Sequence, residues 1–336
     1  MNIIFDGNFL FWKSYSVWSM YHTDRHSSPE ENEQRIAKAL QDREQQQVLL
    51  RKCIIDLCKA VNRFTCEKQS VTVVIDSHSW RYKYYSDYKY ALTKVRGESY
   101  ADFLKVLDMF EKLLRDRGLV VSRVAGAEGD DLLYFWSMYY GELENTDTLI
   151  VTGDSDIRQL INDSISIFCN NSKNLKLFCT EVNKSRYEEY LRNDRDFQKD
   201  ELPIIPTDPF EVLLYKVIMG DTSDNIPKLK KGFGKVAFNK FISYLGSDRP
   251  DKDLPFIEEA EWILEKFCEY TNTPSSTVKE DYWQQIKFNL RMTWLNGEVY
   301  PPELIDDIIR DVQRHRHDYN YYKPYTLEEF YNLTIK

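Results

Sequence analysis

Short apolar runs rich in β-branched residues recur along the chain, and the stretches between several of them carry apolar residues every three or four positions. The runs occupy residues 2–5, 71–75, 119–122, 148–152 and 165–169. Alternation of this kind is typical of a mostly parallel sheet with helices packed on its faces. We therefore predict an α/β fold with a mostly parallel central sheet flanked by helices.

Some helices are marked directly in the sequence. Ser28, Pro29 and Glu31 form a capping box with proline at the first helical position, and an apolar stripe follows over residues 50–61. The charged stretch at 30–47 is expected to be exposed helix or partly mobile. Three further amphipathic helices, packed against the main body, are predicted at residues 258–270, 279–295 and 302–315.

Nine acidic residues fall at the ends of predicted strands or in tight acidic clusters. They are Asp6, Asp76, Glu128, Asp130, Asp131, Asp154, Asp156, Asp221 and Asp224. The carboxyl ends of parallel strands share one edge of a sheet, so the strand-terminal acids should converge there. Clustered carboxylates repel one another unless cations neutralise them, and their hard oxygens select Mg²⁺ or Mn²⁺. The pattern predicts a site for two metal ions.

Each acidic motif also has a purely structural interpretation. A lone strand-terminal aspartate often caps a helix or forms a turn, G-D-S-D at 153–156 can be an Asx turn, and E-G-D-D at 128–131 can face a helix dipole. All of these motifs occur in order on one predicted sheet. Stability gains nothing from so many convergent like charges, so the ordered set favours the metal site.

Charge and cysteine content set further limits. The six cysteines show no C-x-x-C pair and no regular spacing, which indicates neither a zinc site nor a disulfide framework and favours a reducing cytoplasm. No apolar run reaches membrane-spanning length and no basic leader is seen, so we expect a soluble protein that is not secreted. The chain is long enough, at 336 residues, to bury a large core.

The net charge of -9 would ordinarily argue against a nucleic-acid partner, but the nine acids alone supply nine negative charges. The remaining charge is patchy. Five lysines and no acid occupy residues 225–243, namely Lys228, Lys230, Lys231, Lys235 and Lys240. Residues 78–96 carry Arg81, Lys83, Lys89, Lys94 and Arg96 against Asp87 alone. Either patch by itself is explained as a solvated surface.

Four motifs stand in a fixed order: A-E-G-D-D at 127–131, V-T-G-D-S-D-I-R-Q-L at 151–160, M-G-D-T-S-D-N-I-P at 219–227, and G-F-G-K-V-A at 232–237. Each is short, but the ordered set is specific, and it resembles the 5′-nuclease superfamily. That superfamily comprises flap endonucleases, the 5′-exonuclease domains of bacterial DNA polymerases, and phage enzymes of the ribonuclease H or 5′-exonuclease type. The resemblance extends from residue 1 to about residue 243.

The resemblance implies a PIN-like 5′-nuclease fold. Its α/β metal-binding core would cover residues 1–200, with a helical arch at about 78–105, and a helical region would cover 201–336, with a helix-hairpin-helix DNA-binding motif at about 210–243. It places the first metal near Asp6, Asp76, Glu128 and Asp130. It places the second near Asp131, Asp154, Asp156, Asp221 and Asp224, with some ligands acting through water. Two divalent ions roughly 3.5 to 4 Å apart support phosphodiester hydrolysis without a protein nucleophile.

In the family the arch lies over the active site. Arg81 and Lys89 match its basic positions, with Lys89 expected to steady the scissile phosphate. Arg96 is assigned to the next basic position, although it comes later than in relatives. Lys83 and Lys94 are interleaved with aromatic residues, as in grooves that bind single strands. The alternative for this segment is an amphipathic helix with tyrosines packed beneath it.

The hairpin is expected to hold the phosphate backbone of duplex DNA through backbone amides and lysines, and the resemblance adds a bound K⁺ there. The residues assigned to it are Lys228, Lys230, Lys231, Gly232, Gly234 and Lys235. The alternative for its G-x-G is a structural turn between packed helices. Gly129, where relatives often carry alanine, is expected to leave the flanking acids in place.

The resemblance implies a structure-selective 5′-3′ nuclease acting on 5′-flaps, nicked DNA or RNA-DNA hybrids in primer removal and flap processing. Its expected location is the cytoplasm, that of the host if the chain is phage-encoded. A sliding clamp or a single-strand-binding protein is a further expected partner, because Leu327, Phe330 and Tyr331 are spaced as in a clamp-binding peptide, although core packing of a terminal helix explains them equally.

Two other function classes stand beside this interpretation. One is a non-catalytic DNA-binding adaptor on the same fold, which would be expected to have lost some of the acids. The other is a PIN-type RNA-cleaving toxin, which would be shorter and would lack the hairpin. Here all nine acidic positions are filled and the hairpin motif is present.

Overall fold

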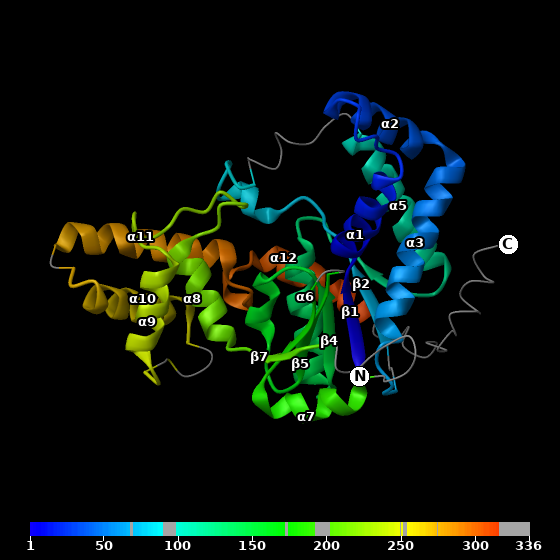
Figure 1. Ribbon diagram of the computed structural model, residues 1–336. Helices are drawn as coiled ribbons and strands as arrows, with labels where there is room; N and C mark the ends of the chain where they lie inside the picture. Colours follow the sequence, from blue (N-terminus) through cyan, green and yellow to red (C-terminus); the bar gives the residue numbers. More distant parts are fainter. Residues whose placement is uncertain are drawn as a thin grey trace. The chain divides into compact units, whose positions relative to one another are not determined.

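The structure, a computed structural model, describes residues 1–67, 70–89, 99–171, 174–191, 202–248, 250, 254–273 and 275–315. The chain forms two compact units (Figure 1). The first takes in the described parts of 1–79, 96–207 and 306–336, and the second those of 80–95 and 208–305. None of the described helices is long and apolar enough to span a bilayer.

A seven-stranded sheet forms the first unit, in the order β3-β2-β1-β4-β5-β6-β7. The strands are β1 (Asn2–Asp6), β2 (Ser70–Val74), β3 (Val120–Ser122), β4 (Thr148–Thr152), β5 (Ile165–Asn171), β6 (Asn174–Cys179) and β7 (Ile204–Pro206). Neighbouring strands pair in parallel except β5 and β6, which pair antiparallel. The predicted, mostly parallel sheet is confirmed, and each of the five predicted strands is present.

Six described helices and the C-terminal part of a seventh belong to this unit. They are α1 (Gly7–Met20), α2 (Pro29–Gln41), α3 (Arg43–Val61), α5 (Tyr100–Asp116), α6 (Gly129–Met138), α7 (Glu181–Tyr190) and, from Asp306 onward, α12 (Pro302–His315). The predicted capping box at Ser28 is present at the start of α2. The charged stretch at 30–47 is helical but broken at Asp42, whose carboxylate accepts from the amides of Glu44 and Gln45 and so starts α3.

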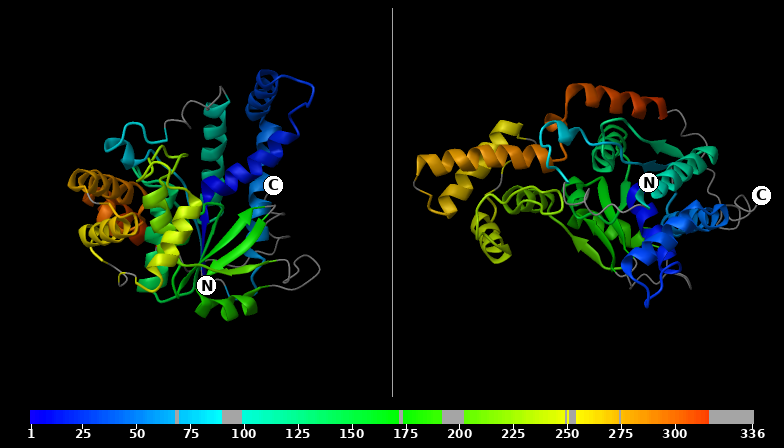
Figure 2. Two further views of the ribbon diagram at one scale, coloured as in Figure 1. Left: turned by 60° about the vertical axis from the view of Figure 1, so that its left-hand side comes forward. Right: turned by 90° about the horizontal axis from the view of Figure 1, so that it is seen from above.

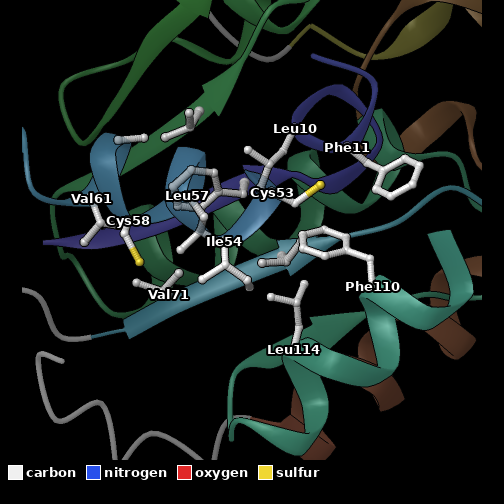
Figure 3. Close-up of a cluster of buried hydrophobic side chains, with 14 of the residues drawn as sticks. Leu10, Phe11, Cys53, Ile54, Leu57, Cys58, Val61, Val71, Phe110 and Leu114 are labelled. Carbon is white, nitrogen blue, oxygen red and sulfur yellow. The ribbon is translucent and has the colours of Figure 1, made fainter. Parts of the chain in front are cut away.

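Apolar side chains of α1, α3 and α5 converge on one face of the sheet (Figure 3). Leu10, Ile54 and Phe110 contribute from the three helices, and Val71 contributes from β2. Successive side chains of a strand point to opposite faces, so alternate sheet residues such as Ile3, Phe5 and Val151 join this cluster. The residues between them face the other way, where α6 packs against β1, β2 and β4. Burial on both faces explains why the strands are apolar throughout.

The second unit is helical. It contains α8 (Pro209–Met219), α9 (Lys235–Leu245), α10 (Phe256–Tyr270), α11 (Ser276–Thr293) and the short η1 (Trp80–Lys83). Helices α8 and α9 flank the loop at 220–234, as the helix-hairpin-helix prediction requires. Helix α10 lies beside α11 (Figure 2) and also packs against α9. The aromatic rings of Phe233, Phe241 and Phe267 meet in its core.

All three predicted C-terminal helices are found, as α10, α11 and α12. The middle of the predicted arch, including Lys94 and Arg96, lies outside the described residues. The described flanks of this segment are η1 and the turn that follows it, on one side, and the start of α5 on the other.

Candidate functional site

Asp6 ends β1 and begins α1. Its Oδ1 accepts from the Phe9 amide at 2.8 Å, and its Oδ2 accepts from the Thr152 hydroxyl at 2.9 Å. Asp6 is therefore the helix cap that the sequence left open as an alternative. Each carboxylate oxygen has a second lone pair, so capping leaves Asp6 able to bind a further group.

Asp76 follows β2 and ties three segments together. Its Oδ1 accepts from the Gly129 amide at 2.5 Å, and its own amide donates to Asn8 Oδ1 at 2.9 Å. Its carbonyl accepts from Arg123 Nε at 3.2 Å. A Cβ on Gly129 would lie 2.6 Å from Asp76 Oδ1, so this glycine permits the close approach of α6 to the carboxylate.

The E-G-D-D motif forms the start of α6. The Asp131 carboxylate accepts from the Glu128 amide at 2.9 Å, and Glu128 Oε2 accepts from the buried Ser79 hydroxyl at 2.8 Å. Asp130 lies in the same first turn and is partly exposed. The structural interpretation of this motif as a helix start is thus confirmed, and it keeps all three acids near the end of β2.

The G-D-S-D motif forms an Asx turn directly after β4. Asp154 Oδ1 accepts from the Asp156 amide at 2.8 Å, and the Asp154 amide donates to Thr152 Oγ1 at 3.1 Å. Asp154 is exposed and Asp156 partly so. The turn presents two carboxylates at the same sheet edge as Asp6.

Electrostatics show that the strand-terminal acids converge. Burial and the negative charges of Asp76 and Asp154 together raise the pKa of Asp6 to about 7, although the hydrogen bonds from Phe9 and Thr152 lower it. A cation between these acids would stabilise their ionised forms, and an all-oxygen donor set suits Mg²⁺ or Mn²⁺. On this observation the residues fit divalent metal ions.

Hydrogen bonds from the surrounding loops hold these carboxylates separately. Within the part of the chain that the structure describes, no three His, Cys, Asp or Glu side chains form a ready-made metal-binding group. The carboxylates are expected to stay apart, because like charges repel one another and neutral amide and hydroxyl donors do not cancel that repulsion.

Asp221 and Asp224 belong to the second unit, in the loop after α8. Asp221 is paired with Lys216 and accepts from the Ser223 amide at 2.8 Å. Burial alone would raise the pKa of Asp221, but the hydrogen bonds from Lys216 and Ser223 hold it below its usual range. Both carboxylate oxygens therefore brace the loop.

Lys89 lies beside Asp224. Its amide donates to the Asp224 carbonyl at 3.1 Å, and the Tyr88 hydroxyl approaches Asp224 Oδ2 at 3.3 Å. Lys89 has a φ of +53°, which is uncommon for a residue with a side chain. The Tyr85 hydroxyl adds a further link by donating to the carbonyl of Asn225. The second unit thus brings the predicted arch lysine to the second pair of acids.

The remaining predicted basic residues differ in exposure. Arg81 is buried, with Nε bound to the Met292 carbonyl at 3.0 Å and its guanidinium 4.8 Å from the Trp80 ring centroid. Lys83 is exposed. Lys94 and Arg96 fall outside the described residues.

In the hairpin, Gly232 has a φ of +80°, a conformation that favours glycine, and Gly234 precedes α9. The helix has no side-chain cap among the described residues, so its first amides point from an uncapped end. Lys228, Lys231 and Lys235 are exposed and Lys230 is partly so.

Several residues that hold the acids were not predicted from the sequence. They are Asn8, Ser79, Thr152, Arg123 and Lys216. Asn8 and Thr152 lie within two residues of a predicted acid, so polar side chains next to strand ends were a usable sequence signal. Arg123 and Lys216 carried no such signal, because their partners are determined by packing.

Comparison with known proteins identifies the family and the fold. The family model for the 5′-3′ exonuclease N-terminal resolvase-like domain matches residues 2–189. A 5′-3′ exonuclease of Buchnera aphidicola subsp. Acyrthosiphon pisum is 28% identical over 180 residues, covering 52% of this chain and 54% of that protein. DNA polymerase I of Chloroflexus aurantiacus is 27% identical over 151 residues, 45% of this chain and 14% of that protein. The chain thus spans about half of the exonuclease and a small part of the polymerase.

Solved structures show the same fold. The 5′-exonuclease of bacteriophage T5 with bound zinc aligns over 94% of this chain and 99% of its own, with a TM-score of 0.58 and 16% identity. A T5 flap endonuclease variant in complex with DNA and metal ions aligns over 95% of this chain and 99% of its own, with a TM-score of 0.56 and 15% identity. The family match covers more than half of the chain. The chain therefore belongs to the 5′-3′ exonuclease N-terminal domain family, within the 5′-nuclease superfamily.

Proposed function

We propose that the chain is a metal-dependent, structure-selective 5′-3′ nuclease. It hydrolyses phosphodiesters in 5′-flaps, nicked DNA or RNA-DNA hybrids, in primer removal and flap processing during DNA replication. One observation carries this proposal: Asp6, Asp76 and Asp154 converge from three adjacent parallel strands closely enough for Asp76 and Asp154 to raise the pKa of Asp6. Such a cluster is costly for folding and useful for binding cations that act on phosphates.

Two divalent ions would be shared among the nine acids. The first would be held by Asp6, Asp76, Glu128 and Asp130, and the second by Asp131, Asp154, Asp156, Asp221 and Asp224. When bound, the ions supply activation of water and charge stabilisation of the leaving 3′-oxygen. Asp131 and Asp221 accept hydrogen bonds from Glu128, Lys216 and Ser223, and some of the nine ligands would act through water. The zinc-bound T5 relative supports a metal-dependent function for this fold.

DNA would be held by the basic residues. Lys89, Arg81 and Arg96 would act near the scissile phosphate, and Lys83 and Lys94 on the single strand. The hairpin glycines, with Lys228, Lys230, Lys231 and Lys235, would hold the duplex backbone, together with a K⁺ ion. The T5 flap endonuclease variant of the same fold was solved with DNA and metal ions, which supports DNA as the partner.

A sliding clamp or a single-strand-binding protein is the proposed protein partner. Leu327, Phe330 and Tyr331 lie outside the described residues. The cytoplasm is the proposed location.

The decisive assay compares 5′-labelled flap, nicked, blunt and RNA-DNA hybrid substrates with Mg²⁺ and with a chelator. Cleavage of flap or nicked substrate only with Mg²⁺ is expected. Asp76→Asn and Asp154→Asn should abolish cleavage and leave DNA binding largely intact. Cleavage that resists the chelator would remove the metal from the mechanism, and loss of binding together with cleavage would point to a structural role for the acids.

The basic residues are tested separately. Lys89→Ala should slow turnover by about two to three orders of magnitude, since it removes a cation from the scissile phosphate. Lys235→Ala should weaken binding to duplex DNA and reduce the slope of log affinity against log salt concentration by about one. Lys240→Ala, farther along α9, is the matched control for Lys235. Equal effects of the two lysine variants would contradict a specific hairpin contact.

A further inference from the structure

A single hydroxyl group, that of Thr152, contacts both the Asp6 carboxylate and the backbone amide of Asp154. Thr152 is the last residue of β4 and is fully buried. Its Oγ1 lies 2.9 Å from Asp6 Oδ2 and 3.1 Å from the amide nitrogen of Asp154. The register explains the first contact: Phe5 pairs with Val151, so the next residues of β1 and β4 are Asp6 and Thr152.

The direction of both hydrogen bonds is determined by chemistry. The single hydroxyl proton of Thr152 points to Asp6 Oδ2, which accepts it. The Asp154 amide only donates, so it uses a lone pair of the same oxygen. The Asp154 carboxylate in turn accepts from the Asp156 amide at 2.8 Å. One side chain thus links the carboxylate of β1 to the turn that carries the acids after β4.

We infer that Thr152 is a positioning residue of the acidic site, holding the Asp6 carboxylate in a set relation to Asp154 and Asp156. This inference deepens the proposed nuclease function and rests on it only for the effect on cleavage. Partners of metal-binding carboxylates set their orientation, and losing such a partner typically costs about 10- to 100-fold in metal affinity or activity. Strand formation does not require the hydroxyl, because valine is also β-branched and favoured in strands.

The test replaces the hydroxyl and then restores it. Thr152→Val should raise the dissociation constant for Mn²⁺, measured by calorimetry on the DNA-free protein, by about 10- to 100-fold. It should lower kcat on a 5′-flap by a similar factor and leave KM for DNA within about two-fold. Thr152→Ser retains a hydroxyl and should stay within about three-fold of the wild type in both measurements.

Thr148→Val is the matched control. Thr148 is a fully buried threonine at the other end of β4, and its hydroxyl donates to the Thr146 carbonyl at 2.9 Å. Its loss should change thermal stability without changing Mn²⁺ affinity or kcat. If Thr152→Val does not fold, Thr152→Ser and Thr152→Ala form the test pair, because they differ only in the hydroxyl oxygen.

Three results would overturn the inference: unchanged Mn²⁺ affinity in Thr152→Val, equal impairment of the serine variant, or equal loss of Mn²⁺ affinity in Thr148→Val. Failure of the proposed function is distinguishable. A wild-type protein that cleaves none of the DNA substrates would refute the nuclease proposal, whereas Mn²⁺ calorimetry would still decide the role of Thr152.

Discussion

Glu259 is a buried acid whose ionisation opposes folding of the second unit. It lies in the first turn of α10, is 4% exposed, and its Oε1 accepts no hydrogen bond among the described residues. Burial raises its pKa from 4.5 to about 7. Replacing it with glutamine removes the charge and keeps the shape of the side chain.

The expected size follows from that pKa. In the unfolded chain Glu259 ionises near pH 4.5, whereas in the folded chain it holds its proton up to about pH 7. The folded state therefore binds more protons in this range, so the free energy of unfolding falls as the pH rises from about 4.5 to 7 and levels off above it. A rise of about 2.5 in pKa corresponds to about 3 kcal/mol, which is the largest effect expected. Glu259→Gln should thus be more stable than the wild type by up to about 3 kcal/mol at pH 8 and by at most about 1 kcal/mol at pH 5.

Urea unfolding of both proteins at pH 5 and pH 8 measures this difference. Because the chain has two compact units, hydrogen exchange of α10 amides should be followed alongside a global signal. Glu258→Gln is the matched control, since Glu258 is the exposed neighbour on the same helix. The same pH dependence in the wild type and Glu259→Gln would refute the reasoning, as would an equal gain from Glu258→Gln.

Three further predictions concern the site and the core. Gly129→Ala would set a Cβ 2.6 Å from Asp76 Oδ1 and should lower the Mn²⁺ affinity measured by calorimetry by about 10-fold. The control Gly234→Ala has nothing within 4 Å of its new Cβ and should keep the wild-type affinity. Equal Mn²⁺ affinities of the two variants would contradict this account. Arg123→Met loses the bond to the Asp76 carbonyl together with ion pairs to Asp108 and Glu111, and should slow flap cleavage several-fold with DNA binding retained. Arg115→Met loses an ion pair to Glu111 but, among the described residues, no bond to Asp76, and should cleave normally. Phe241→Ala removes a fully buried ring and should lower the free energy of unfolding of the second unit by about 3 to 5 kcal/mol. Tyr244 is half-exposed, so Tyr244→Ala should cost much less. An equally small loss in both variants would show that the Phe241 ring is not part of the core.

The predicted elements agree with the structure where the cause is local. The capping box at Ser28 and the helix at 302–315 depend on residues within a few positions of one another, so periodicity and cap chemistry were sufficient. The break at Asp42 was missed because the charged stretch around it has no apolar period. Strands β6 and β7 were also missed. β7 has only three residues and pairs with β6 at the edge of the sheet, where neighbouring strands rather than sequence pattern determine pairing.

The candidate site divides in the same way. Its acids were identifiable from the sequence because they follow apolar runs or form tight acidic clusters, and parallel strands end at a common edge. Their dual roles depend on the fold: Asp6 is a helix cap and Asp154 opens an Asx turn, yet both also contribute to the converging charge.

By itself the sequence determined five of the strands, several helices, the ordered acidic motifs and the family, because these depend on local periodicity and on the identity of side chains. Tertiary structure alone decided which groups hold the acids and which lie buried. Thr152 meets Asp6 across 146 positions, and Arg81 meets the Met292 carbonyl across 211. Contacts over such separations arise from strand register and helix packing, which no local pattern encodes. The physical reason is that hydrogen bonds form between groups that lie close in space, and residues far apart in sequence become close only when the chain folds and closes the long loops between them.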